Sequence, residues 1–332
     1  MTSPAAVGES APSRTDQALL RLAGLRVSFL RRGRRTDVLA GVDLEVPAGR
    51  AVAVVGESGS GKTVTMRAPF GLLPPTAQVS ADAASFDGLD LLSAGRKEVR
   101  GLLGSRIGMV YQNALNALNP TLTISRQLSE VLLWHGVCSK REARQRVLDA
   151  LADVGMPDPR QVAAQYPFQL SGGMRQRAMI AMATIGSPAL LVADEPTTAI
   201  DVTLQRQVLD LLAAQRERGM SVVLVTHDLG VARYFCDDLV VMYAGRVLES
   251  GPTADVLAAP THPYTRGLLA STLEIGGGRG LEAIPGNPVE PGRWPTGCPF
   301  APRCPQAEDR CREPQLLRVL GNRRTACWKA ES

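Results

Sequence analysis

The sequence predicts an α/β fold in which a mainly parallel sheet is covered on both faces. Three short runs are apolar at almost every position, namely residues 51–55 (AVAVV), 189–193 (ALLVA) and 221–225 (SVVLV). Such runs are typical of strands that are buried on both faces. Between them, residues 124–132 and 204–212 repeat apolar side chains every three or four positions, which indicates amphipathic helices. Strands that alternate with helices favour a doubly wound sheet, whose ligands bind beyond the carboxyl ends of the strands.

Length and composition are those of a large soluble protein. The chain has 332 residues, of which 45% are hydrophobic and 21% charged, and this excludes a wholly disordered chain. Aromatic residues make up 4% and the net charge is +5, so neither a base-stacking surface nor an obligatory polyanionic partner is expected. No apolar run reaches the roughly 18–20 residues of a membrane span, and the first residues lack the apolar stretch of a signal peptide. We therefore expect a cytosolic protein.

The organisation along the chain predicts a tail, a main domain and a small module. Residues 1–18 are rich in Ser, Pro, Ala and Gly and predict a flexible tail. Residues 42–46 alternate apolar and acidic side chains, the pattern of a half-exposed strand. Beyond about residue 255 the chain becomes rich in proline, holds four of the six cysteines and has few apolar runs. Residues 256–332 therefore predict a separate small module with little apolar core of its own.

A phosphate-binding motif directly follows the first buried run. Its members are Gly56, Glu57, Ser58, Gly59, Ser60, Gly61, Lys62 and Thr63, which match G-x-x-x-x-G-K-[ST]. Glycines at these positions let backbone amides curl around phosphate oxygens at the start of a helix. Lys62 would reach the β- and γ-phosphates, and Thr63 would bind Mg²⁺. A chance Gly-rich turn is the alternative, but it rarely falls between a strand and a helix, so we interpret the motif as a nucleotide site.

Acidic and imidazole side chains follow the other two buried runs. Asp194 and Glu195 end the second run and His227 follows the third. Asp194 would hold the water shell of the metal, and Glu195 would polarise the attacking water. Taken alone, the acidic pair is compatible with a solvated turn before Pro196, and a single histidine is usually structural. Together with the phosphate loop, they predict that Glu195 and His227 are catalytic.

Residues 170–177 (LSGGMRQR) supply a second surface suited to phosphate. Ser171 can cap a helix, while Gly172 and Gly173 permit close approach of the backbone at its amino end. With these residues in place, residues 20–255 resemble the nucleotide-binding subunits of ATP-binding cassette (ABC) transporters. The resemblance implies a P-loop cassette over residues 19–255, with a RecA-like parallel sheet, an antiparallel β subdomain and an α-helical subdomain over about 113–180.

The resemblance also assigns roles to residues of this chain. Residues 56–63 match Walker A, 190–195 Walker B, 170–177 the signature and 198–201 the D-loop. Gln112 matches the Q-loop, which implies Mg²⁺ binding with Thr63 and Asp194, and His227 matches the switch histidine. Phe29 falls where the family places an aromatic residue against adenine, although a core position explains it equally well. The implied active unit is a head-to-tail pair of cassettes around two ATP molecules, so this chain needs a second cassette.

The carboxyl-terminal residues narrow the family. Residues 262–265 (HPYT) and 297–304 (GCPFAPRC) are similar to the extension of dipeptide and oligopeptide importer ATPases. This implies an ATP-hydrolysing subunit of a peptide importer, peripheral to the cytoplasmic face of the membrane. A paralogous cassette, two permease subunits and, indirectly, an extracytoplasmic binding protein are the implied partners, with no nucleic acid. Nickel or glutathione import is the nearer alternative. An exporter or lipid flippase leaves the extension unexplained, and a soluble cassette acting on nucleic acid usually has coiled-coil insertions or two fused cassettes.

Four cysteines of the extension form a candidate metal site. Cys298, Cys304, Cys311 and Cys327 are separated by five, six and fifteen residues. In a reducing compartment such a set favours metal over disulfides. These gaps are wider than those of usual zinc sites, and four thiolates suit a [4Fe–4S] cluster, which the family resemblance also implies. Zinc and unliganded or disulfide-bonded cysteines remain alternatives.

Overall fold

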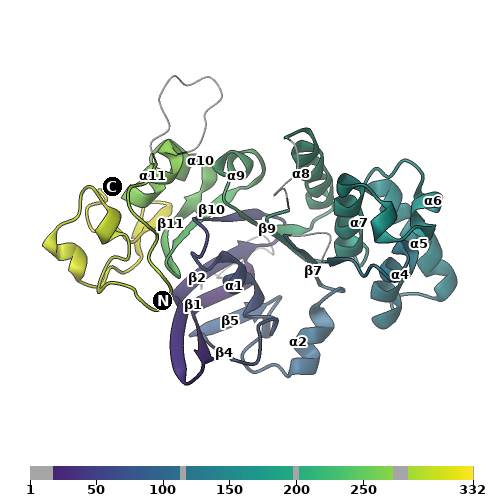
Figure 1. Cartoon of the computed structure of the whole chain (residues 1–332), viewed down its shortest axis with the longest axis horizontal. Helices are drawn as coiled ribbons and strands as arrows, with labels where there is room; N and C mark the ends of the chain where they lie inside the picture. Colours follow the sequence, from purple (N-terminus) through teal and green to yellow (C-terminus); the bar gives the residue numbers. More distant parts are fainter. Residues whose placement is uncertain (1–17, 113–116, 197–201, 272–282, 332) are drawn as a thin grey trace, which may run out of the picture.

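A computed structural model describes residues 18–112, 117–196, 202–271 and 283–331. Figure 1 shows two sheets at the centre, a group of helices at one end and the carboxyl-terminal residues at the other. The strands are β1 (Ala18–Arg31), β2 (Arg34–Pro47), β3 (Ala51–Val55), β4 (Ala77–Ser80), β5 (Ala83–Phe86), β6 (Leu89–Asp90), β7 (Ile107–Val110), β8 (Leu190–Asp194), β9 (Ser221–Thr226), β10 (Asp238–Tyr243), β11 (Arg246–Pro252), β12 (Arg318–Leu320) and β13 (Arg323–Thr325). The α-helices are α1 (Lys62–Arg67), α2 (Arg96–Leu102), α4 (Ile124–Trp134), α5 (Lys140–Asp153), α6 (Pro159–Ala164), α7 (Gly172–Thr184), α8 (Val202–Glu217), α9 (Leu229–Phe235), α10 (Thr253–Ala258) and α11 (Pro263–Ala270), and three 3₁₀ turns are η1 (Pro167–Gln169), η2 (Ala301–Arg303) and η3 (Asp309–Arg312).

The larger sheet has the strand order β12-β13-β11-β10-β3-β9-β8-β7. Its centre, from β10 to β7, is parallel throughout. The three apolar runs of the sequence form the adjacent strands β3, β9 and β8, and β3, β8 and β9 are buried at every position. The predicted strands and their parallel arrangement are therefore confirmed.

The two faces of this sheet bury different partners. Ala53 and Leu224 point to one core, which they share with helical residues such as Val208 of α8. Val54 and Val223, their neighbours along the strands, point to a second core with Met66 of α1 and with the smaller sheet. The antiparallel β subdomain that the family resemblance implies therefore covers this second face together with α1. The reason is that the smaller sheet has an apolar face of its own to bury.

The smaller sheet is antiparallel, with the order β2-β1-β5-β6 and β4 paired to β1. In β2, Val42, Leu44 and Val46 are buried whereas Glu45 is exposed, as the alternating pattern predicts. At the amino-terminal end, Ala18 is already the first residue of β1. The expected tail over 1–18 is therefore one residue too long, and its other residues lie outside the described part of the chain.

Helices α4 to α7 form a group at one end of the molecule (Figure 1). In α4, Ile124, Leu128 and Leu132 are buried, which confirms the helical period in this segment. Ser139 and Glu142 form a capping box at the start of α5; this arrangement satisfies two amides that the helix leaves unpaired. Across the described residues, no helix combines the length and the apolar character needed to cross a bilayer.

The carboxyl-terminal region is joined to the main sheet and core, and this corrects the expectation of a separate module. Strand β13 pairs with β11, so the β12–β13 hairpin extends the larger sheet. Tyr264, Phe300 and Ala326 belong to the same core as β3. These apolar side chains occur singly among prolines and charged residues. No apolar run or periodic pattern in the sequence therefore predicts that they are buried.

A buried histidine fixes the turn that leads into α11. The Glu249 carboxylate accepts hydrogen bonds from the amides of Thr261 (2.8 Å) and His262 (3.0 Å). His262 is 1% exposed, and its Nδ1 accepts a hydrogen bond from the amide of Tyr264 at 3.1 Å. Burial, assisted by the charge of Arg266, lowers the pKa of His262 to about 3. The neutral imidazole is thus part of the folded structure.

We predict that His262 makes the chain less stable in mild acid. Its folded pKa lies below the ordinary 6.5, so the unfolded chain binds more protons as the pH falls from 6.5 towards 3. Between pH 8 and pH 5 this costs about 2 kcal/mol of unfolding free energy. His262→Asn keeps a side chain that can cap α11 but removes the titration, so urea unfolding should show a smaller loss between these pH values.

The control is His135→Asn, which removes a histidine just beyond α4. This variant should follow the wild-type pH profile. Equal profiles for His262→Asn and the wild type would show that another group causes the acid sensitivity.

Candidate nucleotide-binding site

The phosphate loop occupies the turn between β3 and α1. Two of its glycines are required by their surroundings. A Cβ atom at Gly56 would lie 2.1 Å from the carbonyl oxygen of Met242, and one at Gly61, which has a φ of 103°, would lie 2.6 Å from Cδ2 of Leu39. Larger residues would displace this backbone. The loop therefore has the shape that the sequence motif predicts.

Lys62 closes the loop from inside. Its Nζ donates hydrogen bonds to the carbonyl oxygens of Gly56 (2.7 Å) and Glu57 (3.0 Å). Burial lowers the pKa of Lys62, although the neighbouring carboxylates oppose this effect. Ser58 and Gly59, at the tip, are exposed, whereas Ser60 is buried. The loop thus presents its tip to solvent and holds its cation inside.

Asp194, at the end of β8, lies against the start of α1. Its carboxylate accepts hydrogen bonds from Thr63 Oγ1 at 2.9 Å and from Arg67 Nη2 at 3.3 Å. The residue is 3% exposed, and burial raises the pKa of this carboxyl group, while Thr63 and Arg67 partly offset the increase. No motif of the sequence indicated Arg67 as a site residue. Its position on α1, five residues after Lys62, is the only signal for it in the sequence.

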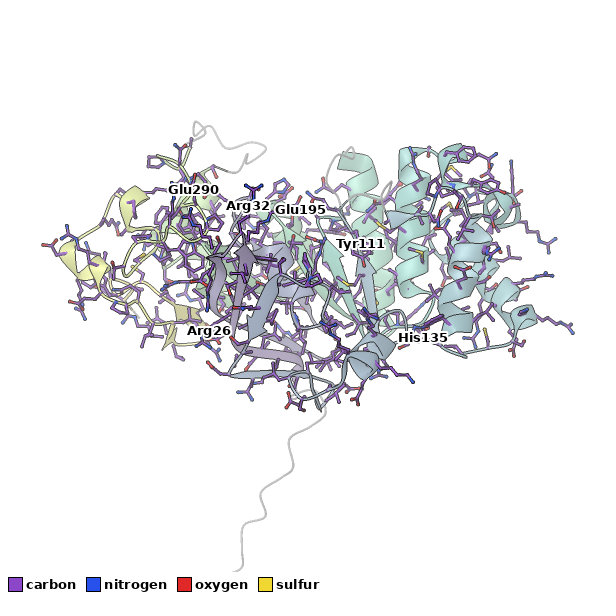
Figure 2. The ribbon with its side chains drawn as sticks, turned by 60° about the horizontal axis from the view of Figure 1, so that its bottom comes forward. Arg26, Arg32, Tyr111, His135, Glu195 and Glu290 are labelled. Carbon is purple, nitrogen blue, oxygen red and sulfur yellow. The ribbon has the colours of Figure 1, made fainter. Side chains whose placement is uncertain are left out.

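Glu195 connects three neighbouring strand ends. Gln112, beyond β7, donates a hydrogen bond from Nε2 to Glu195 Oε2 at 2.9 Å. His227, beyond β9, has its Nδ1 3.6 Å from Glu195 Oε1. Glu195 has a left-handed φ of 48°, and its amide donates to the carbonyl oxygen of Val225 at 2.9 Å. Figure 2 labels Glu195 between Arg32 and Tyr111, the residue before Gln112. The structure brings the three predicted side chains together.

The signature residues lie elsewhere in this chain. Ser171 caps α7 by accepting a hydrogen bond from the amide of Met174 at 3.3 Å, and both Ser171 and Gly172 are exposed. Gly173 is half-buried. Figure 1 shows α7 grouped with α4, α5 and α6, apart from α1. The structure therefore does not bring Ser171, Gly172 and Gly173 to the phosphate loop of the same chain.

Two further assignments are less well defined by the structure. Phe29 of β1 is half-buried against the core below the smaller sheet, so at least part of its ring serves packing. The D-loop residues 198–201 lie outside the described residues. These positions remain predictions from the sequence.

The four carboxyl-terminal cysteines line one cavity of about 20 Å³. All of them are free thiols. Burial raises the pKa of Cys298 to about 11 and also raises that of Cys304. Cys311 Sγ accepts hydrogen bonds from Trp328 Nε1 (3.3 Å) and from the amide of Glu308 (3.5 Å). Within the described ranges, no three His, Cys, Asp or Glu side chains are arranged closely enough to hold a metal ion.

Fold and site together define a P-loop nucleotide-binding cassette. The model of the ABC transporter family matches residues 39–198, and that of the oligopeptide/dipeptide transporter C-terminal region matches residues 248–311. The dipeptide transport ATP-binding protein DppD of Bacillus subtilis is 47% identical over 87% of each chain. The probable D,D-dipeptide transport ATP-binding protein DdpD of Escherichia coli is 44% identical over 94% of this chain and 97% of its own. The chain belongs to the ABC transporter family, among the ATP-binding subunits of the dipeptide and oligopeptide transporters.

Solved structures agree with this assignment. A dimeric ATP-binding cassette in a post-hydrolysis state, bound to ADP and phosphate, matches 70% of this chain and 98% of its own with a TM-score of 0.63 and 29% identity. A cassette from Clostridium perfringens, part of an ABC transporter complex, matches with a TM-score of 0.61 and 26% identity over 73% of this chain and 92% of its own. The cassette fold predicted from the sequence is confirmed.

Proposed function

We propose that this chain binds and hydrolyses ATP to power the import of di- or oligopeptides through an ABC transporter. The chain is an ABC-type ATPase by family, and the curated relatives named above are peptide transport ATP-binding proteins. The observation that carries the proposal is the convergence of Thr63, Asp194, Gln112, Glu195 and His227 beyond adjacent strand ends. Nickel and glutathione import gain no comparable support.

The site residues have chemistry that fits Mg-ATP. Lys62 would leave the two loop carbonyls for the phosphates, and Thr63, Gln112 and Asp194 would hold Mg²⁺. Hydroxyl, amide and carboxylate oxygens are the hard donors that Mg²⁺ prefers. When bound, Mg²⁺ would offset phosphate charge. Phe29 would contact the adenine.

Glu195 has the surroundings of a general base. The Glu195 side chain is 17% exposed, so its carboxylate can reach a water molecule. Gln112 and His227 fix the direction of this carboxylate. A carboxylate held in this way can accept a proton from the attacking water. His227 would stabilise the same arrangement from the end of β9.

We expect Glu195→Gln to retain ATP binding and to lose turnover, because the amide cannot accept the proton. The rate should fall by about 10²- to 10⁴-fold, measured as phosphate release by the assembled transporter. Glu217→Gln, the same change at the exposed carboxyl end of α8, is the matched control and should be unaffected. Near-normal turnover of Glu195→Gln would assign the base to another residue.

A second cassette would complete each ATP site. Ser171, Gly172 and Gly173 lie apart from the phosphate loop of their own chain, and the exposed start of α7 can face the loop of a partner. Backbone amides at a helix amino end suit phosphate oxygens. We propose a head-to-tail pair with a paralogous cassette.

Activity of the isolated chain should therefore be low and should rise with protein concentration. Initial rates measured over a hundredfold dilution series test this expectation, since a composite site forms only on association. Ser171→Ala should lower the activity of the pair without weakening ATP binding by the separate chain. Fast turnover independent of concentration would show that one chain suffices.

Location and other partners follow from the same proposal. The chain would lie on the cytoplasmic face of the membrane, bound to two permease subunits, with the helical group α4–α7 at the contact. An extracytoplasmic binding protein would act on it only through the permease. No nucleic-acid partner is proposed.

We also propose that Cys298, Cys304, Cys311 and Cys327 hold a metal group, with a [4Fe–4S] cluster as the leading candidate. What supports this is that all four cysteines line one cavity and that two N–H groups donate hydrogen bonds to Cys311 Sγ. Four thiolates are the usual ligands of such a cluster. A cavity of about 20 Å³ has room for little more than one water molecule, so the cysteines must rearrange on binding. Once bound, the group would cross-link a region with few apolar contacts of its own.

Protein purified without oxygen should be brown and contain about four irons per chain. Zinc would leave it colourless, and metal analysis of the same sample distinguishes the two. Cys304→Ser should lose the iron, whereas Cys138→Ser, at a cysteine outside the cavity, should retain it. Anaerobic protein with no metal and four alkylatable thiols would refute the proposed site.

A further inference from the structure

Glu57, the second residue of the phosphate loop, forms hydrogen bonds through its amide, its carbonyl oxygen and its carboxylate. Its carbonyl oxygen accepts hydrogen bonds from Lys62 and from the amide of Ser60. Its amide donates to the hydroxyl of Tyr264 at 2.9 Å. Its carboxylate accepts two hydrogen bonds from Arg303, at 2.6 and 3.1 Å. Two of these anchors, Tyr264 and Arg303, thus come from residues more than 200 positions away, in the carboxyl-terminal region.

The side chain of Arg303 is held rigidly where it contacts Glu57. Its side chain is 4% exposed, and the bonds to Glu57 raise the pKa of the guanidinium. Nε donates to the carbonyl oxygen of Pro285 at 2.8 Å, and Nη1 also donates to the hydroxyl of Tyr243 at 3.3 Å. A planar fork held at both sides can shift only together with the backbone around it. The position of the Glu57 carboxylate therefore depends on the position of Arg303.

Tyr264 is equally constrained. The ring is fully buried and lies 4.7 Å from the ring of Tyr243 and 5.3 Å from that of Phe300, measured between centroids. Its hydroxyl has no freedom to follow a moving loop. It thus fixes the amide of Glu57 in space.

These anchors matter most when nucleotide binds. Lys62 must then exchange the carbonyl oxygens of Gly56 and Glu57 for phosphate oxygens. The loop loses the two hydrogen bonds from Lys62 at that step, whereas Tyr264 and Arg303 still hold the amide and the carboxylate of Glu57, and the amide of Ser60 still donates to its carbonyl oxygen at 3.2 Å. A loop held in its binding shape loses less conformational freedom on binding, and its affinity is higher.

The cysteine-lined cavity adjoins the same anchor. Arg303 ends the short turn η2 (Ala301–Arg303), which Cys298 and Cys304 flank. Phe300, beside the turn, packs against Tyr264 and against His262, and His262 lines the cavity. A change at the cysteines therefore acts on both anchors of Glu57.

We propose that Arg303 and Tyr264 are positioning residues for the phosphate loop and that they couple the state of the cysteine-lined cavity to nucleotide affinity. The inference rests on the proposed ATP site. By linkage, a group that binds the cysteines and shifts η2 must change ATP affinity, and ATP must change the affinity of that group by the same factor.

The test is ATP affinity of the full-length chain, measured by calorimetry with Mg-ATP. Tyr264→Phe keeps the ring and removes one neutral hydrogen bond, so the Kd should rise about 3- to 10-fold. Arg303→Lys keeps the buried cation but loses the fork, and the Kd should rise about tenfold or more. Arg312→Ala, at an exposed arginine in the neighbouring turn η3, is the control and should change the Kd less than twofold.

A double-mutant cycle separates positioning from general stability. Glu57→Gln and Arg303→Lys should not be additive in ATP affinity, because each breaks the same contact. Cys304→Ser should weaken ATP binding in the wild type and do so less in the Arg303→Lys background, where only Tyr264 still transmits the change, whereas Cys138→Ser should have no effect in either. Melting temperatures, measured on the same samples, identify any variant that fails to fold. Tyr264→Phe and Arg303→Lys are conservative substitutions, and we expect both variants to fold.

The failures of the two proposals look different. A wild-type chain that does not bind ATP refutes the proposed function. A wild type that binds ATP, together with folded Tyr264→Phe and Arg303→Lys variants of unchanged affinity, refutes the positioning role alone. Equal effects of Cys304→Ser in both backgrounds refute the coupling to the cysteines.

Discussion

The site depends on the parallel pairing of β3, β8 and β9. Val55 pairs with Thr226 and Asp194 with Val225, so the phosphate loop, the acidic pair and His227 all emerge at one edge. Each of these strands is buried on both faces, and a slip of one residue would exchange the two cores that its side chains enter. The packing that stabilises the sheet therefore also sets the distances between the candidate catalytic groups.

Burial shifts the pKa values of two charged groups at that edge in opposite directions. Burial lowers the pKa of Lys62 and raises that of Asp194, because desolvation disfavours the charged form of each. Their neighbours oppose both shifts: carboxylates lie near Lys62, and Thr63 and Arg67 contact Asp194. The left-handed backbone of Glu195 adds local strain of the kind that persists where the surrounding structure holds a residue for function. An Mg-ATP ligand would supply phosphate and metal charges that complement this arrangement.

The carboxyl-terminal region is integrated with the cassette by polar and aromatic contacts as well as by apolar burial. The hairpin β12–β13 continues the sheet, the Glu249 carboxylate caps the turn before α11, and Arg303 reaches the phosphate loop. A region that depends on such contacts is sensitive to small displacements, because buried ion pairs and hydrogen bonds need close geometry. This sensitivity would allow the cysteine-lined cavity to influence the loop, as proposed above.

The sequence by itself determined the cassette fold, the phosphate loop and the three apolar strands, because each of these is a local pattern. Residues 56–63 form one continuous motif, and burial on both faces leaves a run such as residues 51–55 without polar side chains. Asp194, Glu195 and His227 could be given candidate roles because they end or follow predicted strands, and Gln112 because the family resemblance places it in the Q-loop. Only the tertiary structure decided that the carboxyl-terminal residues join the main core, that Arg67 contacts Asp194, and that Arg303 and Tyr264 hold Glu57. These contacts pair residues up to 246 positions apart, and no periodicity along a chain records which distant side chain will fill a given site in the folded core.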